Sequence, residues 1–271
     1  MVNALTKWTS WQQAIKQETR EKGQDMDRVI FTAMTGAQHI LDQQSTNSNN
    51  LANVSTTGFK AQIDSFLAVP VIGGSIDTRA FVVNAGNGTD FSPGTIQETG
   101  RALDVAIQGK GWFSVQRPDG SEGLTRNGSF KVSENGILQT ASGRNVLGGG
   151  GPITIPPNVN ISIGIDGTIS SIDPAVNGGP STPIDVLKLS NPDEKSLVRG
   201  DDGLFNLQDR AAIVPDLNVK VVNGALESSN VNVVNSMVNM ISLARQFDIQ
   251  MQLMKNAENS DQQAAKLFNL N

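Results

Sequence analysis

The chain has 271 residues, 38% of them hydrophobic and 17% charged, with 1 histidine and no cysteine or tyrosine. This length allows one large or two smaller domains with a substantial core. The formal net charge of −5, without a cluster of Lys and Arg, argues against nucleic-acid binding. The lack of cysteine excludes disulfides and thiolate chemistry, and no apolar run approaches the length that would insert in a membrane.

Residues 1–25 do not share the pattern of the rest of the chain. They contain Trp8 and Trp11, followed by a strongly polar stretch. They lack the apolar region and the small-residue cleavage site of a secretory signal. We interpret them as an extension or as the product of a start codon assigned too far upstream. The alternative is a functional helix with Leu5, Trp8 and Ile15 on one face.

Residues 26–60 are predicted to form an N-terminal helix that ends at the turn Gly58-Phe59-Lys60. One heptad register is shared by Ile30, Ala33, Ala37, Ile40, Gln44, Asn47 and Leu51. Such spacing is typical of coiled-coil packing. Asn47, Asn50 and Asn53 repeat at three-residue spacing, and amides weaken a helix unless they find partners.

The middle of the chain predicts β structure. We expect an extended linker over 61–99 and an all-β domain over 100–219. Trp112–Gln116 alternates like a strand. Asn135-Gly136 and Asp166-Gly167 each separate two strand-like runs and predict hairpins with type I′ turns.

Residues 220–271 are predicted to form a C-terminal helix that pairs with the N-terminal one. Its apolar seam is expected at Met237, Met240, Ala244, Phe247, Met251 and Met254. The fold class is therefore α+β, with a coiled-coil-like pair of terminal helices and an all-β middle domain. The alternative is two ordinary core helices of a globular domain.

Enzyme chemistry finds little support. His39, the single histidine, lies between apolar helix positions and has no evident nucleophile or carboxylate partner. We expect a surface or packed histidine, no catalytic residues, no metal site and no cofactor.

Several segments carry a family resemblance. NNLANVSTTGFK (49–60), TGRALDVAIQGKGWFSVQ (99–116), DGSEGLTRNGSF (119–130) and LESSNVNVVNSMVNMI (226–241) occur in this order. They resemble the signatures of the flagellar rod and hook axial proteins, and most closely those of the proximal-rod members.

The resemblance implies a structural subunit of the flagellar basal-body rod, the hollow drive shaft that crosses the periplasm. Its terminal helices would line the tube around the export channel, and the β domain would form the outer layer. The implied partners are copies of itself, other rod proteins and the flagellar type III export apparatus.

The expected assembly interface joins the amides, the Gly-Phe-Lys turn and the apolar seam. Lateral hydrogen bonds between subunits are expected from the asparagines. The residues concerned are Asn47, Asn50, Leu51, Asn53, Thr56, Gly58, Phe59, Lys60, Asn230, Asn232, Asn235, Met237, Met240, Ala244, Phe247, Met251 and Met254.

Other functions stay open from the sequence. Within the family, a distal-rod or hook-type protein is the alternative. Outside it, the β domain could hold a small ligand or glycan as a periplasmic or secreted module, or a hydrolase site could have escaped recognition.

Overall fold

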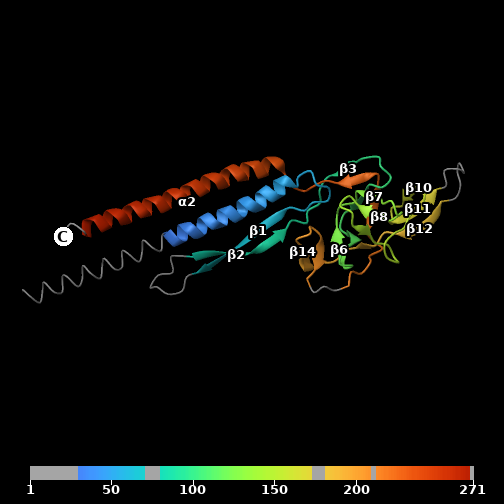
Figure 1. The fold of residues 1–271 in the computed structure, drawn as a ribbon, viewed down its shortest axis with the longest axis horizontal. Helices are drawn as coiled ribbons and strands as arrows, with labels where there is room; N and C mark the ends of the chain where they lie inside the picture. The colour runs from blue at the N-terminus through green and yellow to red at the C-terminus, as the bar shows by residue number, and fades with distance from the viewer. Residues whose placement is uncertain (1–29, 71–79, 173–180, 209–211, 269–271) are drawn as a thin grey trace, which may run out of the picture. The chain divides into compact units, whose positions relative to one another are not determined.

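The computed structural model describes residues 30–70, 80–172, 181–208 and 212–268 (Figure 1). The extension 1–25 lies outside the described residues. The chain forms two compact units, which we call the helical unit (Met1–Asn49, Ile63–Gly88 and Val234–Asn271) and the β unit (Asn50–Gln62 and Thr89–Val233). Long terminal helices and a β-rich middle confirm the predicted fold class.

The helical unit is built on an antiparallel pair of helices, α1 (residues 30–52) and α2 (Val233–Phe268) (Figure 1). Asn47 Nδ2 of α1 donates to Ser236 O of α2 over 2.7 Å. Further along, the Gln250 side chain lies 3.4 Å from where a Cβ on Gly36 would be. Neither α1 nor α2 is long and apolar enough to cross a membrane over its described residues.

The predicted register of α1 is confirmed, but that of α2 is only half right. Ala33, Ala37 and Ile40 are buried as expected. On α2, the residues at the seam are Ser236, Met240, Leu243, Phe247, Gln250, Met254 and Ala257, all buried or half-buried. Met237, Ala244 and Met251 lie one position away and are exposed. The error arose because α2 is apolar on more than one face, so periodicity alone could not select the face that meets α1.

A two-stranded sheet covers another side of α1. It consists of β1 (Gln62–Pro70) and β2 (Ala80–Thr89). The Phe66 ring meets the His39 ring edge-on with centroids 5.4 Å apart, and Thr46 Oγ1 donates to Asp64 Oδ1 over 2.8 Å. His39 is thus a packed histidine. The interpretation of 61–99 as a linker was too simple, because much of it forms paired strands.

The β unit contains antiparallel sheets of different sizes. The largest has the spatial order β14 (Leu197–Arg199), β15 (Phe205–Leu207), β6 (Glu122–Thr125), β5 (Trp112–Gln116), β9 (Asn145–Val146), β8 (Leu138–Thr140) and β7 (Phe130–Val132), with β13 (Leu189–Ser190) also paired to β5. A second sheet joins β10 (Asn160–Ile163), β11 (Thr168–Ile172) and β12 (Thr182–Val186). Separate pairs are β4 (Val105–Gln108) with β16 (Lys220–Asn223), and β3 (Ile96–Glu98) with β17 (Ala225–Glu227). A short 3₁₀ helix, η1, spans Glu194–Ser196.

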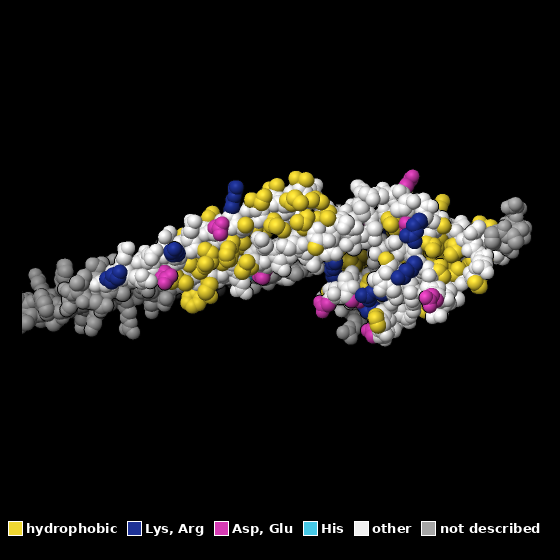
Figure 2. Space-filling model, turned by 45° about the horizontal axis from the view of Figure 1, so that its top comes forward, with side chains coloured by type: hydrophobic (Ala, Val, Ile, Leu, Met, Phe, Trp, Pro, Cys, Tyr) yellow, Lys and Arg dark blue, Asp and Glu magenta, His cyan; other side chains and the backbone are white. Residues whose placement is uncertain are grey.

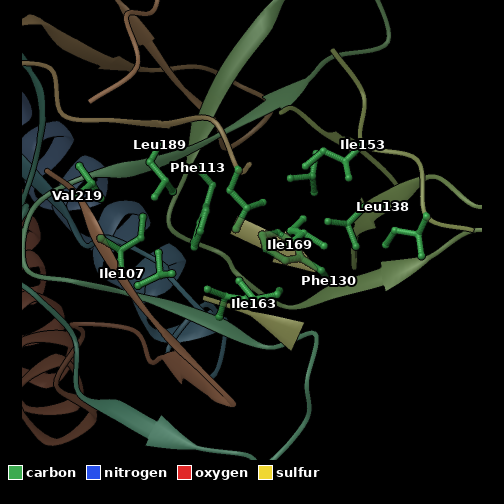
Figure 3. Packing of buried hydrophobic residues seen from close by; sticks show 14 residues of the cluster. Ile107, Phe113, Phe130, Leu138, Ile153, Ile163, Ile169, Leu189 and Val219 are labelled. Atoms are coloured by element: carbon green, nitrogen blue, oxygen red, sulfur yellow. The ribbon is translucent and has the colours of Figure 1, made fainter. Parts of the chain in front are cut away.

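Strand β5 lies in the middle of the largest sheet, and both of its faces are buried. Phe113 on one face packs edge-on against Phe130, with ring centroids 5.3 Å apart, inside a large aliphatic cluster (Figure 3). Trp112 on the other face packs against Phe205 at 4.7 Å in a smaller cluster. Successive residues of a strand point to opposite faces, so one strand serves both clusters.

Both predicted hairpins form, but with a different turn. β7 pairs with β8, and β10 pairs with β11. In the first hairpin Gly136 N donates to Ser133 O over 2.9 Å, and Gly136 has a φ of 76°. Among the described residues, the one non-glycine with positive φ is Asn158, so Asn135 and Asp166 cannot occupy type I′ turns. A type I turn followed by a left-handed glycine explains both connections.

Residues 220–232 also differ from the prediction, because helix α2 begins only at Val233. The preceding stretch forms β16 and β17, in which Val221, Ala225 and Glu227 are buried. The segment expected to begin the C-terminal helical domain is therefore part of the β unit.

Candidate assembly interface

The two terminal signatures meet inside the β unit through asparagine side chains. The Asn50 carboxamide bonds both backbone groups of Gln62, accepting from its N–H and donating to its carbonyl, each over 2.8 Å. Asn230 Oδ1 accepts from Ala61 N over 2.8 Å, and its Nδ2 donates to Asp90 O over 2.9 Å. Asn50 therefore closes a local loop of the chain, whereas Asn230 ties together segments that lie far apart in the sequence.

The expectation of lateral amide bonds needs correction for three asparagines. Asn47, Asn50 and Asn230 use their carboxamides inside the chain. Asn53 is half-buried, and its Oδ1 accepts from Thr56 Oγ1 over 3.2 Å. Asn232 and Asn235 are exposed, so lateral bonding by these two stays a prediction.

The turn at Gly58 is held within the β unit by close backbone contact. Gly58 has a φ of 68°, and its N–H donates to Glu227 O over 2.7 Å. A Cβ at this position would overlap the backbone of Arg126 and Asn127. Glycine is required here for both reasons.

We expect Gly58→Ala to destabilise the β unit by about 2–5 kcal/mol, the sum of the left-handed strain and of overpacking. Gly100→Ala is the matched control. Gly100 has a φ of 72° but no atom within 4 Å of the added Cβ, so the strain alone remains, about 1–2 kcal/mol. Urea unfolding of the purified chains measures both values, and equal losses would refute the contact argument.

Phe59 and Lys60 follow this turn into the interior. The Arg199 guanidinium stacks 4.5 Å from the Phe59 ring centroid and donates to Lys60 O over 3.0 Å. Lys60 Nζ bonds Glu227 Oε1 at 2.7 Å and Ser92 O at 2.8 Å. Burial lowers the pKa of Lys60, although the hydrogen bond and charge of Glu227 oppose that shift. Gly58, Phe59 and Lys60 therefore act within the fold.

The second half of the Glu227 carboxylate faces another cation. Arg126 Nε lies 3.2 Å from Glu227 Oε2. The Cζ atom of the same guanidinium lies 5.7 Å from the centroid of the Trp112 ring. Sequence analysis missed both Arg126 and Glu227. Each lies inside a signature segment, but no local pattern reveals that a charge there will be buried.

Each terminal helix carries exposed apolar side chains, and patches of apolar side chains are visible on the face shown in Figure 2. On α1, Phe31, Met34 and Leu41 are 60%, 54% and 53% exposed, and we call these three the α1 outer stripe. The α2 outer stripe consists of Val234, Val238, Ile241 and Ile249, each more than half exposed. Steps of three, four, seven or eight residues place the members of each stripe on one helix face. The positions skipped by the longer steps hold Gln38 on α1 and Arg245 on α2, both exposed.

Sequence analysis missed these outer stripes. The signal was present in the spacing of Val234, Val238 and Ile241, but the neighbouring methionines gave a competing register. Met237 and Met251 are 51% and 46% exposed, and Ala244 is exposed as well. Met240, Phe247 and Met254 lie in the α1–α2 seam, and Leu51 is half-buried near the end of α1.

The described residues hold no group of His, Asp and Glu able to bind a metal ion. The outer stripes instead give each terminal helix exposed apolar side chains, which lie beside exposed polar and charged ones such as Arg245 and Asp248. Such a surface suits association with another protein.

Comparison with known families gives consistent matches along the chain. Residues 30–60 match the family described as flagella basal body rod protein. Residues 106–171 match the flagellar hook protein FlgE/F/G D1 domain, and residues 222–267 match the flagellar basal body rod FlgEFG protein C-terminal family.

Individual relatives agree with these matches. The chain is 41% identical over 251 residues to the flagellar basal-body rod protein FlgF of Salmonella typhimurium, covering 90% of this chain and 100% of that protein. The same figures hold for FlgF of Escherichia coli. The flagellar basal-body rod protein FlgG of Buchnera aphidicola is 35% identical over 259 residues, covering 85% of this chain and 96% of that protein.

Proposed function

This chain belongs to the flagellar basal-body rod protein family, and we propose that it joins its neighbours in the rod through the outer stripes of α1 and α2. It is a non-enzymatic structural subunit of the basal-body rod, which it forms with other rod proteins. We propose both the contact by which it assembles and its position, which is the proximal part of the rod.

The exposure of the two outer stripes carries this proposal. Phe31 and Val234 are 60% and 69% exposed in the isolated chain, and both gain free energy on leaving water. Single exposed apolar residues are common on protein surfaces, but lines of them at helical spacing are typical of a face that meets another helix. The exposed Met34, Met237 and Met251 suit such contacts because methionine adapts to slightly different pockets.

The seam between α1 and α2 contributes little stability, so the two helices depend on packing against neighbouring subunits. It contains small and polar residues, including Ala33, Ala37, Ser236 and Gln250, which bury little apolar surface. Helices gain most of their stability from tertiary packing. We therefore expect the helical unit to become more ordered when copies and other rod proteins dock on its outer stripes.

The arrangement of copies follows from the kind of contact. The outer stripes of α1 and α2 differ in sequence, so a contact between them joins different surfaces of successive copies. Repeated head-to-tail contacts give a ring or an open helical tube. A tube with helices inside and the β unit outside would transmit torque and leave an export channel. We expect delivery of each copy through the type III export apparatus.

Thiol reactivity tests the proposal, since the chain has no native cysteine. Ile241→Cys places a single thiol on the α2 outer stripe, where the native side chain is 57% exposed. Its reaction with a maleimide should slow by roughly tenfold or more between the purified monomer and isolated basal bodies, because interface cores exclude water.

The control is Leu243→Cys in the seam, where the native side chain is 9% exposed. This thiol should react slowly in both states. Both variants are first checked for normal swimming. Equal reactivity of Ile241→Cys in the monomer and in basal bodies would exclude the outer stripe as an interface.

A further inference from the structure

Three charged side chains from distant parts of the sequence are buried together in the β unit. The side chains of Lys60, Arg126 and Glu227 are 1%, 5% and 2% exposed. Lys60 Nζ and Arg126 Nε lie 2.7 and 3.2 Å from the two oxygens of the Glu227 carboxylate. We propose that these residues form an ionic lock, which lets residues 58–60 enter the interior only when Glu227 is in place.

The charges explain why the lock is conditional. Glu227 contacts both cations, whereas the charges of Asp90 and Glu194 each favour the charged form of one of them, Lys60 and Arg126 respectively. Without Glu227, docking of residues 58–60 would bury the Lys60 ammonium beside the Arg126 guanidinium. Burying an unpaired charge is expensive, and a like charge nearby adds to the cost. The charge of Arg126 indeed acts to lower the pKa of Lys60.

Hydrogen bonds make residues 58–61 depend on β17 and on the residues that directly follow it. Gly58 N donates to Glu227 O over 2.7 Å, and Ala61 N donates to Asn230 Oδ1 over 2.8 Å. Glu227 Oε1 also accepts from Gly94 N over 3.0 Å. Strand β17 supplies the Glu227 groups and is itself positioned by pairing with β3, and Asn230 follows three residues after its end.

The order of events follows from the chain separation. Lys60 and Glu227 are 167 residues apart in the sequence. A chain that lacks β17 can therefore form much of the β unit. It cannot bury residues 58–60 without the free-energy cost of burying an unpaired Lys60 charge. The lock makes closure of residues 58–62 depend on the arrival of the C-terminal signature. The lock lies within the β unit and does not depend on which surface makes the rod.

Hydrogen exchange of the full-length chain tests the lock. Glu227→Gln keeps the shape and hydrogen-bonding oxygen of the side chain but removes its charge. Exchange at the Ala61 and Gln62 amides should accelerate by about a hundredfold or more, as expected when a buried ion pair loses one partner. The amides of β5 should change much less. The matched control, Glu134→Gln, removes a charge from an exposed side chain in the β7–β8 turn and should leave all these rates near wild type.

Charge balance gives a second readout. Lys60→Met leaves one cation facing one carboxylate, so it should accelerate exchange at Gln62 less than Glu227→Gln does. The double variant Lys60→Met/Glu227→Gln buries one cation fewer than Glu227→Gln and should recover roughly tenfold of the lost protection or more.

Two outcomes would overturn the lock. One is wild-type exchange at Ala61 and Gln62 in Glu227→Gln. The other is a double variant whose loss equals the product of the two single losses, which is the result for independent contacts. If Glu227→Gln exposes β5 as well, recovery in the double variant still decides the question: recovery supports the lock, and no recovery refutes it.

Discussion

A chain that ends at Val233 is expected to keep a folded β unit and to build no flagellum. Residues 234–271 belong to the helical unit, whereas the β unit ends at Val233. Their removal takes away the partner of the α1 seam and the whole α2 outer stripe, but leaves Glu227 and Asn230 with their contacts. In a strain that carries no other copy of this protein, swimming in soft agar should be lost completely.

The residue at which the chain is truncated decides whether a loss of motility can be attributed to α2. A shorter chain that ends at Asn223 also loses β17, Glu227 and Asn230, so its β unit would be weakened and loss of motility would be uninformative. For the chain that ends at Val233, urea unfolding should show a cooperative transition of the β unit. Normal swimming of that strain would show that α2 is dispensable and would contradict the proposed assembly.

The fold was predictable where local pattern and final environment agree. Trp112–Gln116 alternates in sequence and forms β5 over the same residues. The α1 register at Ala33, Ala37 and Ile40 was also correct, since small and apolar residues recur there at heptad spacing. Glycine after Asn135 and Asp166 correctly marked two hairpins, because a left-handed residue is needed in either kind of turn.

The errors arose where tertiary contacts choose between locally equivalent options. Met237 and Leu243 are both apolar positions on α2, and only packing against α1 buries the second. The buried strands β16 and β17 are short, and their alternation is weak beside the long helix that follows. Propensity and period are weak guides in such places.

The roles of the signature asparagines depended on contacts that sequence spacing does not reveal. The three-residue spacing of Asn47, Asn50 and Asn53 indicated that the amides need partners, which was correct in principle. It did not show that Asn50 would bond Gln62, or that Asn230 would bond Ala61. The first pair forms because the chain turns back after α1, and the second forms because the tertiary fold brings residues 169 apart together.

Ile241→Glu is expected to abolish swimming without weakening the isolated chain. Ile241 is 57% exposed, so a glutamate there can stay hydrated in the monomer, and the free energy of unfolding should change by about 0.5 kcal/mol or less. In the rod, the same carboxylate would be buried against an apolar neighbour, at a cost of several kcal/mol (of order 3 or more). Repetition at every copy makes that cost prohibitive for assembly.

Gln246→Glu is the matched control. It introduces the same charge on the same helix, at an exposed polar position outside the α2 outer stripe. We expect this strain to swim normally. Equal defects in both strains would indicate sensitivity to negative charge anywhere on α2 and would not support a specific apolar contact.

Electron microscopy of basal bodies from the Ile241→Glu strain tests the central claim most directly. The account predicts basal bodies that stop before a complete rod, while the purified variant unfolds at the same urea concentration as the native chain. Complete rods in that strain, with the glutamate variant incorporated, would contradict assembly through the outer stripes.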